Sequence, residues 1–108
     1  MIIKYEDKEN LIVEGMRGGV GHALIKRFDD ESKMIAQITL PPNASIGLHQ
    51  HLNDEEIIYI IEGHGVCISG GKEVAIAKGF VNYVKRGESH SIINNTEQDL
   101  VLLAIILK

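Results

Sequence analysis

The sequence predicts an all-β domain that closes into a small barrel, and three observations support this prediction. Short runs rich in Ile and Val recur along the chain, and these residues suit a pleated, half-buried strand. Clusters of turn-forming residues separate the runs at intervals close to the roughly 8–12 residues that are typical of a β-sandwich or barrel. No segment of convincing length shows the hydrophobic period of a helix.

Eight runs are predicted to form strands, with turns or loops between them. Gly70 and Gly71 join two runs by a two-residue connection, which is a strong hairpin signal because both positions can take a positive φ. The predicted strands cover residues 22–28, 34–40, 57–61, 66–69, 73–77, 80–84, 89–93 and 100–107. Loops are predicted at residues 29–31, 41–43, 85–87 and 94–96.

Two of the predicted strands are apolar on both faces. Residues 57–61 and most of residues 100–107 lack polar alternation, whereas a strand with one wet face alternates polar and apolar side chains. We expect one face of each strand to lie inside the barrel and the other to lie against another layer. Because so short a chain has little left to form that layer, the pattern predicts a homodimer.

Size and composition limit the number of domains and the classes of partner. A chain of 108 residues is expected to form a single domain, residues 1–108, since compact domains commonly contain about 50 to 200 residues. The net charge of −4 and the lack of a basic stripe argue against a nucleic-acid partner. The single cysteine, Cys67, excludes a disulfide framework and a cysteine-based zinc site. It is predicted to be a small buried side chain.

The sequence carries no signal for secretion or for a membrane. The first residues lack a basic leader followed by an apolar stretch. The longest apolar run, residues 100–107, is too short to cross a bilayer core of about 30 Å as a helix. We therefore expect a soluble, cytoplasmic protein without a membrane partner.

The spacing of two histidines favours an extended segment that binds a metal ion. His49 and His51 are two residues apart. On a helix their side chains would diverge by about 200°, but on a strand they share one face with their Cα atoms about 6.6 Å apart. A metal ion can use this pair only if the backbone is extended.

An acidic residue and a third histidine can complete such a site. Residues 52–54 are predicted to turn the chain, so that Glu56 opens the next strand and faces the histidines. Glu55 has the competing parity along that strand and is the alternative ligand. His90 follows the turn at residues 85–87 and begins a strand of its own.

These residues fall into two motifs that resemble the two motifs of the cupin family. The first motif runs from His49-Gln50-His51 through Glu56 to Gly63, and the second runs from Gly79 through Gly87 and His90 to Asn94. Order and spacing match over residues 43–94, about half of the chain. The chain thus resembles small single-domain cupins of the RmlC-like superfamily. The fold that this implies is the cupin-type double-stranded β-helix, a jelly-roll barrel.

Three positions depart from the family pattern. Asn43 stands where a glycine usually precedes the first histidine, Lys85 stands where a proline is usual, and Phe80 stands where an aspartate is frequent. Asn43 can tolerate a positive φ, so its turn is expected to survive. None of the three departures touches the expected ligands.

The resemblance implies a metal centre inside the barrel, with one divalent transition metal ion: Mn, Fe, Ni, Co or Zn. The chemistry agrees, because three imidazoles and one carboxylate suit a borderline divalent ion and leave one or two positions for water or a substrate. Ile58 and Ile60 are expected to face inward with Glu56, and Ile92 and Asn94 to share a face with His90. The predicted pocket therefore has mainly apolar walls and few charged groups. The implied ligands are His49, His51, Glu56 and His90.

Three functions follow from this pattern. The first is a metal-dependent enzyme, dioxygenase- or decarboxylase-like, that acts on a small organic substrate. The second is a protein that binds or senses a small molecule without turnover. The third is a sugar isomerase or epimerase, for which the expected extra acid–base groups are not visible. No catalytic residue beyond the expected ligands can be assigned.

The glycine-rich segment at residues 16–21 is a further feature of the sequence. It lacks the Lys-Ser/Thr of a phosphate loop, so it is predicted to form a turn rather than a nucleotide site. A similar Arg-Gly-Gly segment precedes the first barrel strand in some small cupins, where N-terminal residues can contact the partner subunit.

Overall fold

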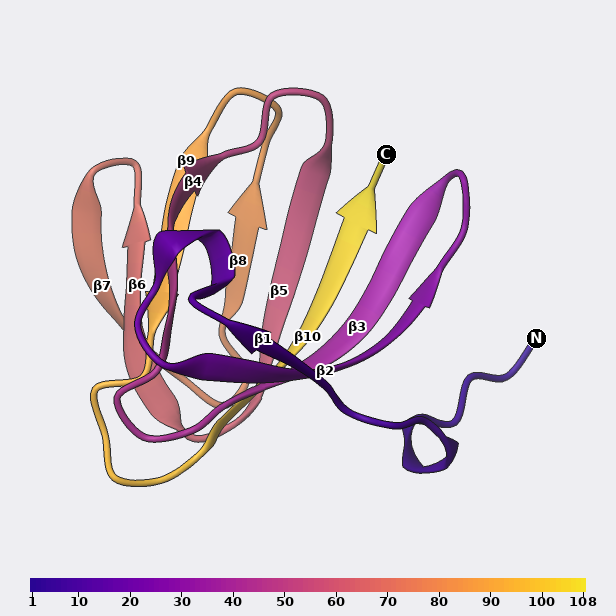
Figure 1. Cartoon of the computed structure of the whole chain (residues 1–108). Helices are drawn as coiled ribbons and strands as arrows, with labels where there is room; N and C mark the ends of the chain where they lie inside the picture. The colour runs from indigo at the N-terminus through magenta and orange to yellow at the C-terminus, as the bar shows by residue number, and fades with distance from the viewer.

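The computed structural model describes all 108 residues as ten β-strands and two short 3₁₀ helices. A six-stranded sheet has the order β1-β2-β3-β10-β5-β8, and a four-stranded sheet has the order β4-β9-β6-β7. Every strand pair is antiparallel. The sheets face each other across the interior of an open-ended barrel (Figure 1). The elements are η1 (Tyr5–Asp7), β1 (Leu11–Glu14), η2 (Met16–Gly18), β2 (His22–Asp29), β3 (Lys33–Leu40), β4 (Ser45–Gln50), β5 (Glu55–Glu62), β6 (His64–Ser69), β7 (Lys72–Ala77), β8 (Val81–Val84), β9 (Ser89–Ile93) and β10 (Leu100–Leu107).

The predicted strands are all present, with ends within two residues of those expected. The hairpin at Gly70-Gly71 is confirmed, with φ values of +59° and +75°, and Asn43 takes the positive φ expected of it, +65°. Two strands were not predicted. β1 has only four residues, too few for a clear alternation, and Gly47 interrupts the apolar pattern of β4.

A β-bulge in β4 turns the first histidine into the barrel. Ile46 pairs with Ile92 and His49 pairs with His90, so β4 contains one more residue than β9 over this stretch. Ile46 is a buried core residue and Leu48 is 62 % exposed. Simple alternation would place Ile46 and His49 on opposite faces, and the inserted residue brings both to the inner face.

The interior is filled by aliphatic side chains from both sheets. Ile58 and Ile60 face inward from β5, and Ile92 faces them from β9; each is at most 1 % exposed. The expected inward orientation of these residues is confirmed. Cys67 is also buried, and burial raises the pKa of its thiol to about 11, so the reactive thiolate is scarce at neutral pH.

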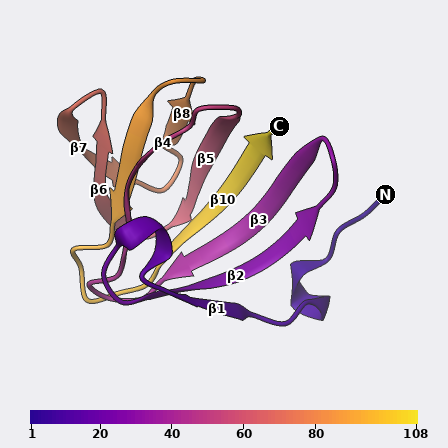
Figure 2. The ribbon, with the colours of Figure 1, turned by 45° about the horizontal axis from the view of Figure 1, so that its top comes forward.

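The outer face of the six-stranded sheet is apolar and only partly covered. Val101, Leu103 and Ile105 project outward from β10 and are half-buried, and Tyr59 on β5 is exposed. The chain has no further layer of secondary structure over this face (Figure 2). The expectation that both strands bury both faces is therefore wrong for the single chain. The homodimer stays a prediction.

The chain contains no helix with the length and hydrophobicity needed to cross a membrane.

Candidate metal centre

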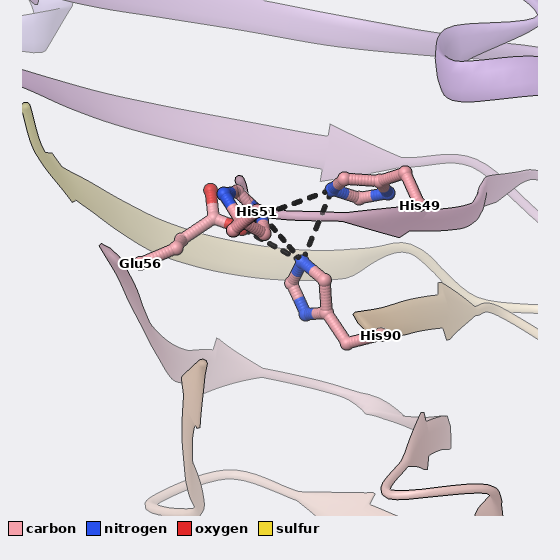
Figure 3. A group of neighbouring side chains, drawn as sticks. All are labelled: His49, His51, Glu56 and His90. Carbon is pink, nitrogen blue, oxygen red and sulfur yellow. Dashed lines mark hydrogen bonds and ion pairs between the residues drawn. The ribbon is translucent and has the colours of Figure 1, made fainter. Parts of the chain in front are cut away.

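The structure brings together the side chains that the motifs singled out. His49 lies on β4, His51 directly follows β4, Glu56 lies on β5 and His90 lies on β9. Their ligand atoms all lie within 4.8 Å of one another, and only His49 is more than slightly exposed. Figure 3 shows the three imidazole rings and the carboxylate converging from these strands on one point.

The backbone around the site explains how sequence-distant residues meet. His49 and His90 are directly opposite each other on paired strands of the four-stranded sheet. The backbone of His51 is fixed by the turn before β9, because its N–H donates to the Glu88 carbonyl at 3.0 Å and its carbonyl accepts from the Gly87 N–H at 2.6 Å. Glu56 approaches from the other sheet.

The structure also distinguishes the two neighbouring glutamates. Glu56 is buried and points at the histidines, with its Oε1 2.9 Å from His90 Nε2 and 3.3 Å from His51 Nε2. Glu55 points the other way along β5, and its Oε2 accepts a hydrogen bond from the Tyr83 hydroxyl at 2.9 Å. Glu55 is therefore not part of the cluster.

Each imidazole is held by an acceptor behind it. His51 Nδ1 lies 2.7 Å from Asp54 Oδ1, His90 Nδ1 lies 2.7 Å from Asn82 Oδ1, and His49 Nδ1 lies 2.7 Å from the Gly47 carbonyl oxygen. Each Nδ1 is placed to donate a hydrogen bond to its oxygen acceptor, which corresponds to the tautomer with the hydrogen on Nδ1. In the neutral form of this tautomer, the Nε2 lone pair of each ring faces the centre of the cluster.

This arrangement suits a cation at its centre. The Nε2 atoms of the histidines lie 3.1 to 3.2 Å apart pairwise. In neutral rings with the hydrogen on Nδ1, the Nε2 lone pairs face one another and the Glu56 carboxylate. A cation between them would relieve the repulsion. Imidazoles oriented from behind by a carboxylate, an amide and a carbonyl are also typical of metal ligands. The residues present therefore fit a divalent metal ion.

The electrostatic surroundings keep His49 in the form that can bind a metal. Burial lowers the pKa of His49 below its ordinary value, and the charge of Arg17 acts in the same direction, against the hydrogen bond to Gly47. A lowered pKa keeps the ring neutral at pH 7, and neutral imidazole is the metal-binding form.

A cavity of about 150 Å³ adjoins the cluster, with His49 and Glu56 in its wall. Two arginines, Arg17 and Arg27, also line it. The predicted apolar wall is present, but the expectation of few charged groups is wrong, because two of the lining side chains are cationic. The apolar lining residues are Met16, Ile25, Met34, Ile38, Ile46 and Ile106.

Several residues of this site were not found from the sequence. Asp54 was assigned only to a turn, and Asn82 lies on a different sheet from the ring that it holds. Arg27 does carry a signal: it shares strand parity with Ala23 and Ile25, which face the core. Arg17 carries none, because its place depends on how a glycine-rich turn folds back onto β4.

Comparison with known proteins agrees with the fold and the motifs. The model of the family described as "Cupin domain" matches residues 36–106, more than half of the chain. The chain belongs to the cupin family. The predicted jelly-roll barrel is thereby confirmed as a cupin fold.

Two comparisons relate this cupin to proteins of Thermotoga maritima. The chain is 38 % identical to a relative named oxalate-binding protein, across 99 % of this chain and 93 % of the relative. A crystal structure described as that of a predicted oxalate decarboxylase from T. maritima has a TM-score of 0.94 at 35 % identity, with 99 % of this chain and 98 % of that chain covered.

A more distant cupin shares only the architecture. The structure of a sugar phosphate isomerase from Silicibacter pomeroyi has a TM-score of 0.85 at 18 % identity, with all of this chain and 76 % of that chain covered. At this level of identity the likeness extends to the fold alone.

Proposed function

We propose that this cupin binds one divalent transition metal ion and uses it to bind a small carboxylate anion. The observation that carries the proposal is the convergence of three imidazole Nε2 atoms and one carboxylate at the wall of a cavity with two cationic side chains. When bound, the ion supplies Lewis-acid positions for ligand oxygens. The residues that hold it are His49, His51, Glu56 and His90.

The cavity supports a short, negatively charged ligand. Its volume of about 150 Å³ is close to that of a protein cavity that holds benzene, a molecule of about six non-hydrogen atoms. Arg17 and Arg27 favour an anion, and carboxylate oxygens are good partners for both guanidinium groups and divalent ions. The name of the relative, oxalate-binding protein, supports a ligand of this class.

The lining favours binding over proton-transfer chemistry. Apart from the proposed ligands His49 and Glu56, its ionisable groups are Arg17 and Arg27, and a guanidinium stays protonated in proteins. No side chain is left to act as a general acid or base, which such chemistry needs. The description of the T. maritima structure as a predicted oxalate decarboxylase makes turnover of the same ligand the second candidate.

Calorimetric titration of oxalate into the Mn-loaded and the chelator-treated protein tests the proposal. We expect binding at least about tenfold tighter with the metal, a difference of about 1.4 kcal/mol in binding free energy. Formate and CO₂, assayed in the same samples, separate turnover from binding. Equal oxalate affinity with and without metal would contradict the proposal, and so would an absence of binding heat in both samples.

Replacing Asp54 by Ala is expected to weaken metal binding while the ligands remain. The carboxylate of Asp54 holds His51 through Nδ1 at 2.7 Å, and loss of such an outer partner typically costs about 10–100-fold in metal affinity. Competition with a coloured chelator measures the change. Asp99→Ala, at an exposed loop position, is the matched control and should keep wild-type affinity. Equal affinities in the two variants would argue against a role for Asp54.

A further inference from the structure

The cavity carries two arginines that have no acidic partner within the chain. Arg17 comes from η2 and Arg27 comes from β2. No carboxylate lies within 4.0 Å of either guanidinium, since every ion pair of the chain involves other residues. Both residues are exposed and line the cavity together with His49 and Glu56, so they lie where the cavity meets solvent.

Arg17 is fixed in place by close backbone packing. Its φ of +55° is rare for a residue other than glycine. A Cβ atom at Gly47 would lie 2.2 Å from the Arg17 carbonyl oxygen, and one at Gly19 would lie 2.1 Å from the Ser45 carbonyl oxygen. Only glycines allow η2 to lie this close to β4. The segment that carries Arg17 is therefore seated on the strand that carries His49.

Arg27 is an inward-facing charge at the end of an apolar row. Ala23 and Ile25, which precede it at the same parity along β2, are both buried. Arg27 itself is exposed, so its guanidinium lines the cavity while it stays in contact with solvent. Met34 and Ile106 lie in the same cavity wall, and apolar surroundings of this kind strengthen attraction between the arginine and an anion.

We propose that Arg17 and Arg27 bind the second negative charge of the ligand, so that the site selects short dicarboxylates over monocarboxylates. The inference rests on the proposed function, in which the metal ion binds carboxylate oxygens at the base of the cavity. Two carboxyl groups close together place the remaining oxygens toward the open end, where the guanidinium forks can each donate two hydrogen bonds. A monocarboxylate of the same size offers these arginines one charge fewer.

Titration of oxalate and oxamate into Mn-loaded protein tests the inference. Oxamate has the size of oxalate but carries an amide in place of one carboxylate. We expect Arg17→Gln and Arg27→Gln each to weaken oxalate binding about 10–100-fold, the effect of losing charge-assisted hydrogen bonds. Oxamate affinity should change much less. Arg86→Gln, which alters an exposed turn outside the cavity, is the matched control and should bind both anions like the wild type.

Metal content measured in the same samples separates this inference from the proposed function. Wild-type metal content in both cavity variants, together with selective loss of oxalate binding, supports the inference. Oxalate affinity within about twofold of wild type in both variants, equal loss of both anions, or loss of the metal itself would overturn it. Failure of the Mn-loaded wild type to bind either anion would overturn the proposed function, and the inference with it.

Discussion

Replacing His51 by Ala is expected to remove most of the metal from the purified protein. His51 is 3 % exposed, and its Nε2 lies 3.1 and 3.2 Å from those of the other two histidines. Without it the centre loses one imidazole ligand and the contact that Asp54 makes with that ring. Since loss of an outer partner alone costs about 10–100-fold in affinity, we expect less than about a tenth of the wild-type metal content by elemental analysis.

His64→Ala is the matched control for this experiment. His64 is exposed on β6 and lies outside the cluster, so its variant should retain near-stoichiometric metal. Added metal should also raise the unfolding temperature of the wild type and of His64→Ala, because a ligand that binds only the native state stabilises it. The same addition should leave His51→Ala nearly unchanged. Equal metal content in all three proteins would count against the proposed centre.

The fold could be predicted from the sequence because the strands obey simple local rules. Strand parity with Glu56 and His90 predicted which side chains of β5 and β9 face inward, and the pair Gly70-Gly71 predicted the hairpin. These signals are contained within a few neighbouring residues. β1 and β4 were not predicted. β1 is too short to show a pattern, and the pattern of β4 is broken by an inserted residue.

Strand parity and motif spacing predicted the four expected ligands but not the residues around them. The convergence of the three histidines and Glu56 agrees with the expectation. The partners behind the rings depend on contacts between sheets and across a turn, as with Asn82 and Asp54. Arg17 lines the cavity because Gly19 and Gly47 let the backbones of η2 and β4 approach closely. Such a contact between distant segments leaves no pattern in the local sequence. The cationic character of the cavity therefore emerged from the structure.

Replacing Asn94 by Ala is expected to cause the largest loss of stability among single polar substitutions outside the metal cluster. Asn94 follows β9 and is fully buried. It does not line the cavity; its side chain instead links the end of β3 to the loop before β10. Its Nδ2 donates to the carbonyl oxygens of Leu40, Pro41 and Gln98 at 2.7 to 3.1 Å, and its Oδ1 accepts from the Thr96 N–H and hydroxyl.

Truncation to Ala leaves the buried Leu40 carbonyl and several partly buried groups without their partner, and it opens a small cavity. Each unsatisfied buried group costs about 1–3 kcal/mol, so we expect a loss of about 3 kcal/mol or more in the free energy of unfolding, measured by urea titration of the metal-free protein. Asn95→Ala makes the same chemical change at an exposed neighbour and should cost less than about 0.5 kcal/mol. Asn94→Asp keeps the acceptor oxygen but cannot donate to the three carbonyls, so it should be nearly as unstable as Asn94→Ala. A stable Asn94→Asp would show that the accepted bonds from Thr96, rather than the donated ones, hold the loop.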